Sequence, residues 1–426
     1  MQSTKQIKYF AIVDCNSFYV SCERVFNPSL KNVPVVILSN NDGCIVSRSQ
    51  EVKEIGIPAG MPLFKCERDI KASNTKVFSS NYTLYADMSK RVMDTIAHLV
   101  PEIEVYSIDE AFFQVMGDHQ EIKEKIKQVR ETILQWTGIP TSIGVGKTKT
   151  LAKVANHIAK KEKGTNGTYC LFDNKQAELV LRDLPVQEVW GVGRRIAEKL
   201  IRRRITTALG LAKSNDRWIK EQFTVVGLKI VNELRGIPCY DLEQVPQPRK
   251  NIVSSRSFGY PVIEQKDLEE AIATYTARAA EKMRKQESVT QYIYIYITTN
   301  RFQPNSKQYY NSISVKLPSQ TDYSPTLIHY ALKGLRTIYK PGFQYKKAGV
   351  MLSFLVPKPE MQINLFDSYD TEKQTNVMKV FDRLNNRYGH NIMKVASEGL
   401  KKGWIMKSDY KSNKYTTDWN EIPVVS

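Results

Sequence analysis

The sequence predicts a protein of several domains in the α+β class. At 426 residues the chain is too long for one ordinary hydrophobic core. Strand-like apolar runs and helical periods alternate over roughly the first 170 residues and again after about residue 250. A compact helical region separates these two stretches. We therefore expect an α+β part, a helical part and a second α+β part.

The first part of the chain has the pattern of a split βαββαβ arrangement. A short strand at 10–13 ends at Asp14, and a hairpin within IEVYSIDEAFFQV places Asp109 and Glu110 at its tip. The other predicted strands are at 33–39, after the NNDGC turn and at 140–146, and the predicted helices follow Asp14 and cover 83–99, 120–135 and 147–161. Strands far apart in sequence are neighbours in this layout, so Asp14 can lie beside the 109–110 pair.

The later parts of the chain are a helical region, a linker and a second α+β unit. Residues 183–240 are helical, and DLEQVPQPRK at 241–250 has two prolines and no apolar period, as in a linker. The second unit has predicted helices at 267–285 and 325–339 and strands at 291–299, 312–317 and 348–356. Its central strand QYIYIYITT puts Ile293, Ile295 and Ile297 on one face and Tyr292, Tyr294 and Tyr296 on the other. A tail from about 358 contains an amphipathic helix with Val377, Val380, Phe381 and Leu384.

Charge is the strongest signal in the composition. The chain has 62 Lys and Arg against 44 Asp and Glu, a net charge of +18, which favours nucleic acid as a partner, although a solubilising surface is the alternative. The six cysteines form no C-x-x-C pair and have no zinc-like spacing, so reduced thiols are expected. No apolar run of about 18 residues and no secretory segment occur, which predicts a cytoplasmic protein without a membrane partner.

Two adjacent carboxylates at a hairpin tip raise each other's pKa unless a positive charge lies between them. An isolated Asp–Glu pair is also common in a solvated turn. Together with Asp14, however, Asp109 and Glu110 form an oxygen-only set that suits Mg²⁺. Two such ions sharing carboxylates are typical of phosphoryl transfer.

That interpretation requires cations for a triphosphate. The candidates are Lys147, Lys153 and Lys160 on the helix after IGVG, and Arg48 and Lys53 after NNDGC. Each alone is also compatible with an ordinary surface residue.

The stretch WGVGRRIAEKL has the form of a helix-hairpin-helix. Gly191 and Gly193 permit a tight turn whose backbone N–H groups can meet a phosphate, and Arg194 and Arg195 add charge. An ordinary turn between helices is the alternative.

The motifs, taken together, resemble those of the Y-family, or translesion, DNA polymerases. IVDCNSFYVSCE, NNDGC, SSNYTLYADMS, YSIDEAF, IGVGKTKTLAKVA, the GVG hairpin and SSRSFG occur in the family's order. FSSNYTLYADMSKRV and YKSNKYTTDWNEIPVV are most similar to its UmuC branch, and the resemblance covers essentially the whole chain. It implies a right-hand polymerase with a ferredoxin-like palm, small fingers, a helix-hairpin-helix thumb and an αβ little finger. The implied boundaries are 1–17 and 84–173 for the palm, 18–83 for the fingers, 174–240 for the thumb, 241–250 for the linker, 251–357 for the little finger and 358–426 for a tail that carries clamp-binding and partner-binding regions.

The resemblance also implies site residues. Asp14, Asp109 and Glu110 take the positions of the catalytic metal ligands for two Mg²⁺ ions, with the backbone carbonyl of Cys15 beside them, and Tyr19 takes the position of the steric gate that excludes ribonucleotides. The implied nucleotide contacts are Phe18, Tyr19, Ser47, Gln50, Lys53 and Lys160, and the implied DNA contacts are Gly191, Gly193, Arg194, Arg195, Ser255 and Arg256. Tyr19 could also be an aromatic residue on the buried face of a helix. Gln50 and Lys53 stand where many members have tyrosine and arginine, and a lysine lacks the bidentate fork of arginine.

In the tail, Gln362, Leu365 and Phe366 resemble the short peptide by which bacterial polymerases hold the sliding clamp, although a surface loop is the alternative. The resemblance implies primer-template DNA, deoxynucleoside triphosphates (dNTPs), the clamp, a UmuD-type dimer and a RecA filament as partners. The expected function is template-directed, error-prone synthesis past damaged bases. A metal-dependent nuclease and a non-catalytic DNA-binding scaffold are the alternatives. The predicted gate and fingers and the lack of a histidine near the acids argue against the nuclease, and the grouped acids argue against the scaffold.

Overall fold

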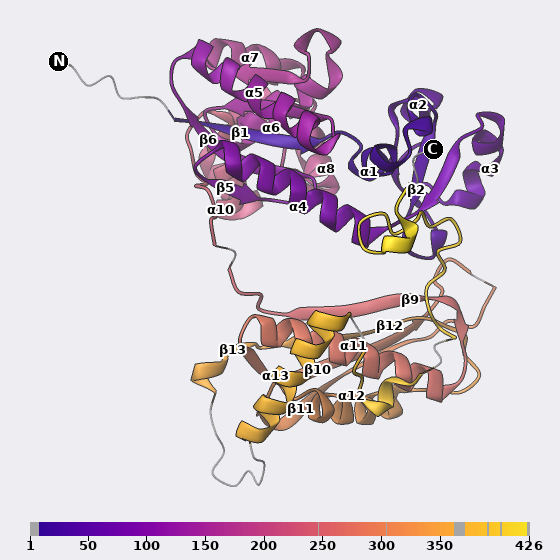
Figure 1. Ribbon diagram of the computed structural model, residues 1–426. Coiled ribbons are helices and arrows are strands. Elements are labelled where there is room, and N and C mark those ends of the chain that lie inside the picture. Colours follow the sequence, from indigo (N-terminus) through magenta and orange to yellow (C-terminus); the bar gives the residue numbers. More distant parts are fainter. Residues whose placement is uncertain are drawn as a thin grey trace. The chain divides into compact units, whose positions relative to one another are not determined.

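The computed structural model describes residues 8–245, 247–303, 305–361, 371–389, 392–400 and 403–423. It divides into two compact units (Figure 1). The first unit contains Met1–Ser39, Gly43–Pro246 and Tyr410–Ser426, and the second contains Asn40–Asp42 and Gln247–Asp409. The end of the chain therefore groups with the first unit, whereas the predicted boundaries between palm, fingers, thumb and tail stay predictions.

The main sheet of the first unit confirms the split βαββαβ arrangement. Its strand order is β5-β6-β1-β7-β8. The strands are β1 (Lys8–Cys15), β5 (Ile103–Val105), β6 (Glu110–Met116), β7 (Thr141–Gly146) and β8 (Thr168–Leu171). Apart from β8, which the sequence pattern did not predict, this is the order in which such a motif places its strands, with β1 between β6 and β7.

Helices cover both faces of this sheet. Residues of α4 (Tyr82–Leu99) and α5 (His119–Thr137) share a core with Ala11, Val13 and Phe113, whereas α6 (Lys149–Lys161) packs on the opposite face with Phe10 and Phe112. Gly144 of β7 permits the close approach of α6, because a Cβ atom there would lie 2.1 Å from the backbone nitrogen of Asn156. The glycines of the IGVG motif thus have a packing role.

A smaller sheet of order β3-β2-β4 forms the predicted fingers region. Its elements are α1 (Phe18–Phe26), β2 (Val35–Leu38), β3 (Ile45–Arg48), α2 (Gln50–Ile55), α3 (Leu63–Ala72) and β4 (Lys76–Ser79). The sequence pattern predicted β2 and β3 but not α2, α3 or β4. The strand β4 pairs in parallel with β2, but only one of its four residues is buried, so it lacks the continuous apolar run of β2.

The predicted helical region, 183–240, contains α8 (Arg194–Arg202), α9 (Ala208–Ala212) and α10 (Asp216–Leu234), and α7 (Asn174–Asp183) precedes it. Its core is continuous with α6, and the backbone N–H of Thr150 donates to the carboxylate of Glu233 at 3.0 Å. The start of the predicted linker is also held by this unit. Lys149 Nζ pairs with Glu104 and donates to the carbonyl of Asp241 at 2.6 Å, and the N–H of Glu243 donates to the same Glu104 at 2.7 Å.

The second unit is a sheet of order β11-β10-β12-β9 backed by two helices. Its elements are β9 (Ile252–Val262), α11 (Gln265–Lys285), β10 (Ser288–Thr299), β11 (Tyr310–Thr321), α12 (Ser324–Ile338), β12 (Tyr345–Ser353) and the short β13 (Val356–Pro357). The predicted alternation along β10 is confirmed. Ile293, Ile295 and Ile297 are fully buried, whereas the tyrosines between them are partly exposed.

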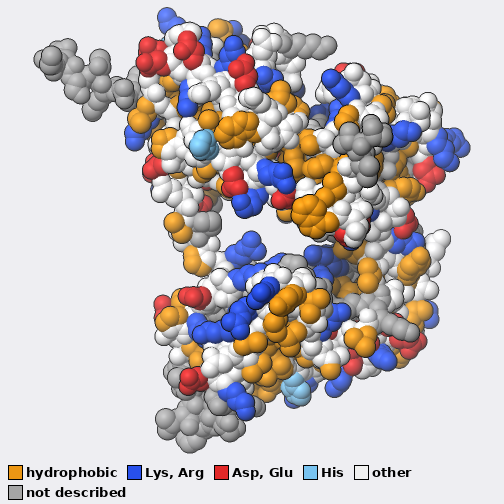
Figure 2. All heavy atoms as spheres, viewed as in Figure 1, with side chains coloured by type: hydrophobic (Ala, Val, Ile, Leu, Met, Phe, Trp, Pro, Cys, Tyr) orange, Lys and Arg blue, Asp and Glu red, His pale blue; other side chains and the backbone are white. Residues whose placement is uncertain are grey.

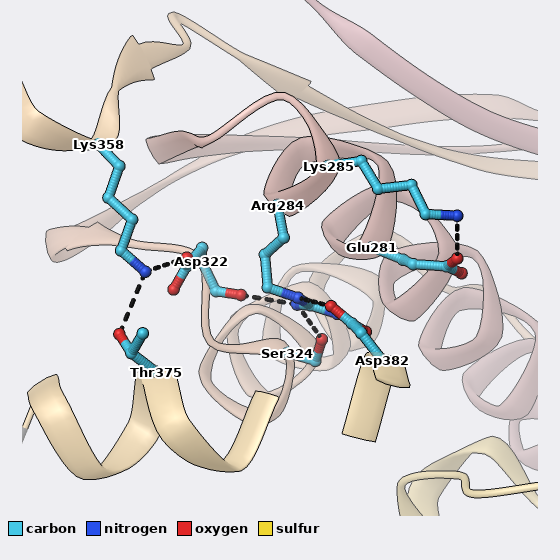
Figure 3. A network of polar contacts seen from close by, with 8 residues as sticks. All are labelled: Glu281, Arg284, Lys285, Asp322, Ser324, Lys358, Thr375 and Asp382. Carbon is cyan, nitrogen blue, oxygen red and sulfur yellow. Dashed lines mark hydrogen bonds and ion pairs between the residues drawn. The ribbon is translucent and has the colours of Figure 1, made fainter. Parts of the chain in front are cut away.

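The tail helix α13 (Thr371–Tyr388) is held on the second unit by charged groups (Figure 3). The Arg284 guanidinium makes two hydrogen bonds to Asp382, of 2.6 and 2.8 Å, and Lys358 Nζ bridges Asp322 and Thr375 at 2.6 and 3.1 Å. The predicted helix is confirmed, but Val377 and Val380 from its apolar set are nearly half exposed. Of the helices in the described ranges, none combines the length and the apolarity needed to cross a membrane.

Candidate active site and nucleic-acid interface

The acidic residues lie together at adjoining strand ends, as the βαββαβ layout predicted. In the antiparallel pairing of β1 with β6, Asp14 lies directly opposite Glu110. The N–H of Cys15 donates to the carbonyl of Asp109 at 2.9 Å. Because residues directly opposite each other in an antiparallel pair project to the same face, the Asp14 and Glu110 side chains share one side of the sheet.

Each carboxylate has its own polar partner. Lys160 Nζ forms an ion pair with Asp14, and Lys153 Nζ lies 3.0 Å from both carboxylate oxygens of Glu110. The Ser107 hydroxyl donates to Asp109 at 2.6 Å. Within the described part of the chain, no three His, Cys, Asp or Glu side chains converge closely enough to hold a metal ion. The assignment of Asp14, Asp109 and Glu110 as metal ligands therefore stays a prediction.

Burial perturbs the titration of this site. Asp14 is only 7% exposed, and desolvation raises its pKa to about 7, aided by the neighbouring Glu110 and opposed by Lys160. A cation that binds Asp14 must therefore displace a proton near neutral pH.

The donor atoms at this site fit a hard divalent cation. Burial raises the pKa of the Cys15 thiol far above its usual value, so this thiol stays protonated and is a poor metal ligand. Only oxygen donors then remain among the predicted ligands, which is the set that Mg²⁺ prefers.

A basic cluster lies beside Asp14. Burial lowers the pKa of Lys53, and the nearby charges of Arg48 and Lys160 lower it further, so both of these cations lie within electrostatic reach of Lys53. Lys53 Nζ donates to the Ser17 hydroxyl at 3.2 Å. Such a cluster is suited to a polyphosphate.

Other predicted nucleotide contacts lie at the edge of this cluster or outside it. Ser47 is half-buried on β3, and Gln50 is exposed, with its side chain directed to Glu54 at 3.3 Å. Lys147 donates to Asn174 at 2.9 Å. This hydrogen bond gives Lys147 a structural partner on α7.

Tyr19 is half-buried on α1 and lies against two other tyrosines. Its ring stacks on that of Tyr85, with 4.4 Å between centroids and 13° between planes, and it meets Tyr82 edge-on at 6.2 Å. The preceding Phe18 is 3% exposed and belongs to the core, so its side chain offers no surface for a nucleotide. The gate assignment of Tyr19 stays a prediction.

The predicted hairpin begins a helix as expected. Gly191 has a φ of 87°, a conformation that glycine adopts without strain, and a Cβ there would lie 2.7 Å from Ile230. Gly193 directly precedes α8, and Arg194, with its side chain 89% exposed, is the first helical residue. Arg195 follows it and is exposed too. The free N–H groups at this helix start can receive a phosphate.

The two predicted DNA contacts of the second unit lie on opposite faces of β9. Ser255 shares the open face with Tyr296, because Gly349 lies between them and a Cβ there would meet both side chains. Arg256 points to the helix-covered face, like the buried neighbours Ser254 and Phe258. The two side chains therefore project from different faces of the sheet, and their assignment as DNA contacts stays a prediction.

The open face of the second sheet is aromatic and basic, which the sequence pattern did not identify as functional. Tyr294 and Tyr310 share a hydrogen bond of 3.0 Å between their hydroxyls. Cations lie over the rings of this face: Lys316 over Tyr292, Lys347 over Tyr296 and Arg301 over Tyr310, at 5.4–5.9 Å. Figure 2 views the second unit from its helix-covered side and shows further Lys and Arg side chains there, in keeping with the net charge of +18.

Several further residues of the first unit escaped the sequence patterns. Ser107 orients Asp109, and the rings of Tyr106 and Trp190 lie 4.6 and 5.6 Å from Nζ of the predicted cation Lys153. The spacing of Tyr82 and Tyr85, one helical turn apart in SSNYTLYADMS, was the signal that could have predicted a stacked group beside Tyr19. Gln362, Leu365 and Phe366 lie outside the described residues.

Comparison with protein-family models gives three matches along the chain. Residues 13–157 match the impB/mucB/samB family, and residues 249–365 match the impB/mucB/samB family C-terminal domain. Residues 375–425 match a domain of unknown function, DUF4113.

Similar sequences and folds extend over nearly the whole chain. The chain is 41% identical to Protein UmuC of Salmonella typhimurium over 97% of this chain and 99% of that protein. It is 39% identical to Protein MucB of Escherichia coli over 98% of this chain and 99% of that protein. It is 27% identical to DNA polymerase IV of Oceanobacillus iheyensis over 92% of this chain and 93% of that protein. Among solved structures, a Y-family DNA polymerase chimera of Dbh and Dpo4 has a TM-score of 0.63 at 20% identity, covering 84% of this chain and all of the chimera. An insertion ternary complex of Dbh DNA polymerase has a TM-score of 0.52 at 20% identity, covering 82% of this chain and 99% of that one.

Proposed function

This chain belongs to the impB/mucB/samB family, in the UmuC branch of the Y-family DNA polymerases, and from this membership we propose how it carries out error-prone translesion DNA synthesis. It is a DNA-directed DNA polymerase whose reaction depends on a divalent metal. The observation that carries the proposal is the pairing of Asp14 with Glu110 across β1 and β6, with Asp109 next to them and the Arg48, Lys53 and Lys160 cluster beside them.

The catalytic site is formed by the carboxylates of Asp14, Asp109 and Glu110 and the carbonyl of Cys15, which would hold two Mg²⁺ ions. Mg²⁺ supplies, when bound, the positive charge that lowers the pKa of the primer 3′-hydroxyl and offsets the charge that develops on the phosphates. Lys153 pairs with the carboxylate of Glu110, and Lys160 pairs with that of Asp14, where its charge opposes the rise that burial causes in the pKa of Asp14.

Cations bind the triphosphate of the nucleotide, and an aromatic ring limits which sugar fits. Arg48, Lys53 and Lys160 bind the triphosphate by charge, and Tyr19 closes the space that a ribose 2′-hydroxyl needs. No histidine contacts the acids in the described residues, and none is required, because the metals make a dedicated base unnecessary. Primer-template DNA contacts the start of α8 through Gly191, Gly193, Arg194 and Arg195, and lies on the open face that carries Ser255 and the tyrosines of β10.

A primer-extension assay tests the whole proposal. The purified full-length chain, a labelled primer on a template and the four dNTPs are incubated with and without Mg²⁺. We expect the primer to lengthen only with Mg²⁺. Shortening of the primer would indicate a nuclease, and DNA binding without any change in primer length would indicate a scaffold. Either outcome contradicts the proposal.

The exposed arginines of α8 lead to a prediction about how DNA affinity depends on salt concentration. Each phosphate that a protein neutralises contributes about −0.9 to the slope of log affinity against log salt concentration. Replacing Arg194 and Arg195 by alanine should therefore make the slope shallower by up to about 2 units. Fluorescence anisotropy of a labelled duplex at several salt concentrations measures the slope.

A matched control for this double variant lies on α10 of the same unit. Arg217 is also 89% exposed and pairs with a glutamate four residues later, as Arg194 does, and Lys220 nearby is exposed. Arg217→Ala with Lys220→Ala removes the same charge and should leave the slope unchanged. Equal slopes for both double variants would show that α8 does not contact the DNA backbone.

We also propose that Gln362, Leu365 and Phe366 bind the sliding clamp, on the sequence resemblance alone, and that a UmuD-type dimer and a RecA filament act with the chain. A tether raises effective concentration without altering the active site.

Leu365→Ala with Phe366→Ala should therefore abolish clamp-stimulated synthesis on long templates and leave single-nucleotide insertion unchanged. The control replaces Phe302 and Leu400, which are 94% and 91% exposed. Clamp stimulation that persists in the Leu365–Phe366 variant would place the tether elsewhere.

A further inference from the structure

The end of the chain packs against the fingers side of the first unit, although it belongs to the matched domain of unknown function. In Figure 1 it is the yellow segment beside α1 and the start of α4. The N–H of Ser79 donates to the carbonyl of Tyr410, and the N–H of Tyr410 donates to the Ser79 hydroxyl, both at 2.9 Å. The ring of Tyr415 stacks on Phe26 of α1, with 5.0 Å between centroids and 4° between planes. These contacts hold the segment 410–423, here called the terminal segment, against β4 and α1.

The Asn81 side chain adds a third point of attachment just before α4. Its amide nitrogen donates to the Ser412 hydroxyl at 3.0 Å and to the carbonyl of Asn413 at 3.1 Å. Asn81 is fully buried. Ser412 is thereby held in one place, with its hydroxyl free to donate its own hydrogen elsewhere.

The recipient of that hydrogen is a buried carboxylate. Glu23 on α1 is 1% exposed, and one of its oxygens accepts hydrogen bonds from the Ser412 hydroxyl at 3.0 Å and from the Tyr85 hydroxyl at 2.8 Å. Burial raises the pKa of Glu23, and these two hydrogen bonds oppose that shift. A buried carboxylate that loses a donor is left partly unsatisfied, which is costly. The positions of Glu23 and Tyr85 therefore depend on Ser412.

Tyr85 connects this carboxylate to the nucleotide site. It is fully buried, and its ring is the one on which Tyr19 stacks, nearly parallel at 4.4 Å. Stacked rings at this distance restrict each other's tilt. The contacts thus form a continuous path from Ser412 through Glu23 and Tyr85 to Tyr19. All four residues belong to the first unit, although the two ends of the path are 393 residues apart in sequence.

We propose that the terminal segment is a positioning element of the sugar-selecting site, in which Ser412 holds Tyr19 in place through Glu23 and Tyr85. This inference rests on the proposed role of Tyr19 as the wall against the 2′-hydroxyl. It assigns to the last part of the domain of unknown function a role in choosing deoxyribonucleotides over ribonucleotides. Ser412, Glu23 and Tyr85 do not touch the substrate and act only through the Tyr19 ring.

The test compares single-nucleotide insertion of a deoxynucleotide and of the matching ribonucleotide by the full-length chain. Ser412→Ala should raise kcat/KM for the ribonucleotide by about three- to tenfold, the effect of one lost hydrogen bond, and leave kcat/KM for the deoxynucleotide unchanged. Tyr85→Phe keeps the stacked ring and removes the same kind of donor, so it should have a similar effect. Thr417→Ala, an exposed hydroxyl in the same segment, is the matched control and should change neither value.

The double variant Tyr19→Ala with Ser412→Ala separates positioning from a general structural effect. If Ser412 acts through Tyr19, the double variant selects sugars no differently from Tyr19→Ala alone. Independent, additive effects would overturn the inference, as would a lower melting temperature of Ser412→Ala with unchanged sugar selection. If Tyr19→Ala itself leaves sugar selection unchanged, the proposed role of Tyr19 fails. If Tyr19→Ala changes sugar selection but Ser412→Ala and Tyr85→Phe do not, the role of Tyr19 is supported and the proposed role of the terminal segment is wrong.

Discussion

Asp109→Asn is expected to reduce primer extension by about a hundredfold or more, while the affinity for primer-template DNA stays close to that of the parent. Asp109 lies at the hairpin tip beside Cys15, with its carboxylate oriented by the Ser107 hydroxyl. Asparagine keeps the size of the side chain but removes the charge that a divalent cation requires. Single-turnover insertion kinetics measure the chemical step, and anisotropy of a labelled duplex measures binding.

The matched control for Asp109→Asn is Asp183→Asn. Asp183 is exposed at the end of α7 in the same unit, so the control makes the same chemical change away from the acids. It should extend primers at the parent rate. Extension by Asp109→Asn at more than a few per cent of that rate would remove Asp109 from the catalytic set, and an equal loss of DNA binding would indicate a structural role instead.

Tyr19→Ala is expected to raise ribonucleotide insertion relative to deoxynucleotide insertion by about ten- to a hundredfold, the range that exclusion by shape alone provides. The side chain is half-buried, stacked on Tyr85 and bounded by Tyr82, so its ring is a rigid wall and not a mobile surface group. The ratio of kcat/KM for the two sugars, measured with one template base, gives the discrimination.

Tyr19→Phe is the control for this variant, because it keeps the ring and removes only the hydroxyl. The wall depends on the ring, so Tyr19→Phe should keep the parent's sugar discrimination. Discrimination that is lost in both variants would mean that the hydroxyl, through a hydrogen bond, does the selecting. Discrimination that is kept in both would return Tyr19 to a packing role.

Much of the first unit could be predicted because its signals are local. Short apolar runs identified β1, β6 and β7, a helical period identified α4, α5 and α6, and the βαββαβ order then required β1 to lie beside β6. The meeting of Asp14 with Glu110 follows from those local signals. The short β4 and the helices α2 and α3 were missed, because each of them buries only one or two residues and so gives a weak apolar pattern, whereas the equally short β2 is buried throughout.

By itself, the sequence determined most strands of the main sheet, their order, and which carboxylates meet at the strand ends, because periodicity and strand connection depend on neighbours in the chain. The tertiary structure decided which face each side chain occupies and which hydrogen-bond partners it has. Alternation puts Ser255 and Arg256 on opposite faces of β9, but only the packing of α11 decides which face is open. Likewise, the carboxylate of Glu23 is buried without a charged partner of its own on α1, and only the folded chain brings Tyr85 and Ser412 to it from 62 and 389 residues away. A buried polar group requires a hydrogen-bond partner, but that requirement does not specify where in the sequence the partner lies.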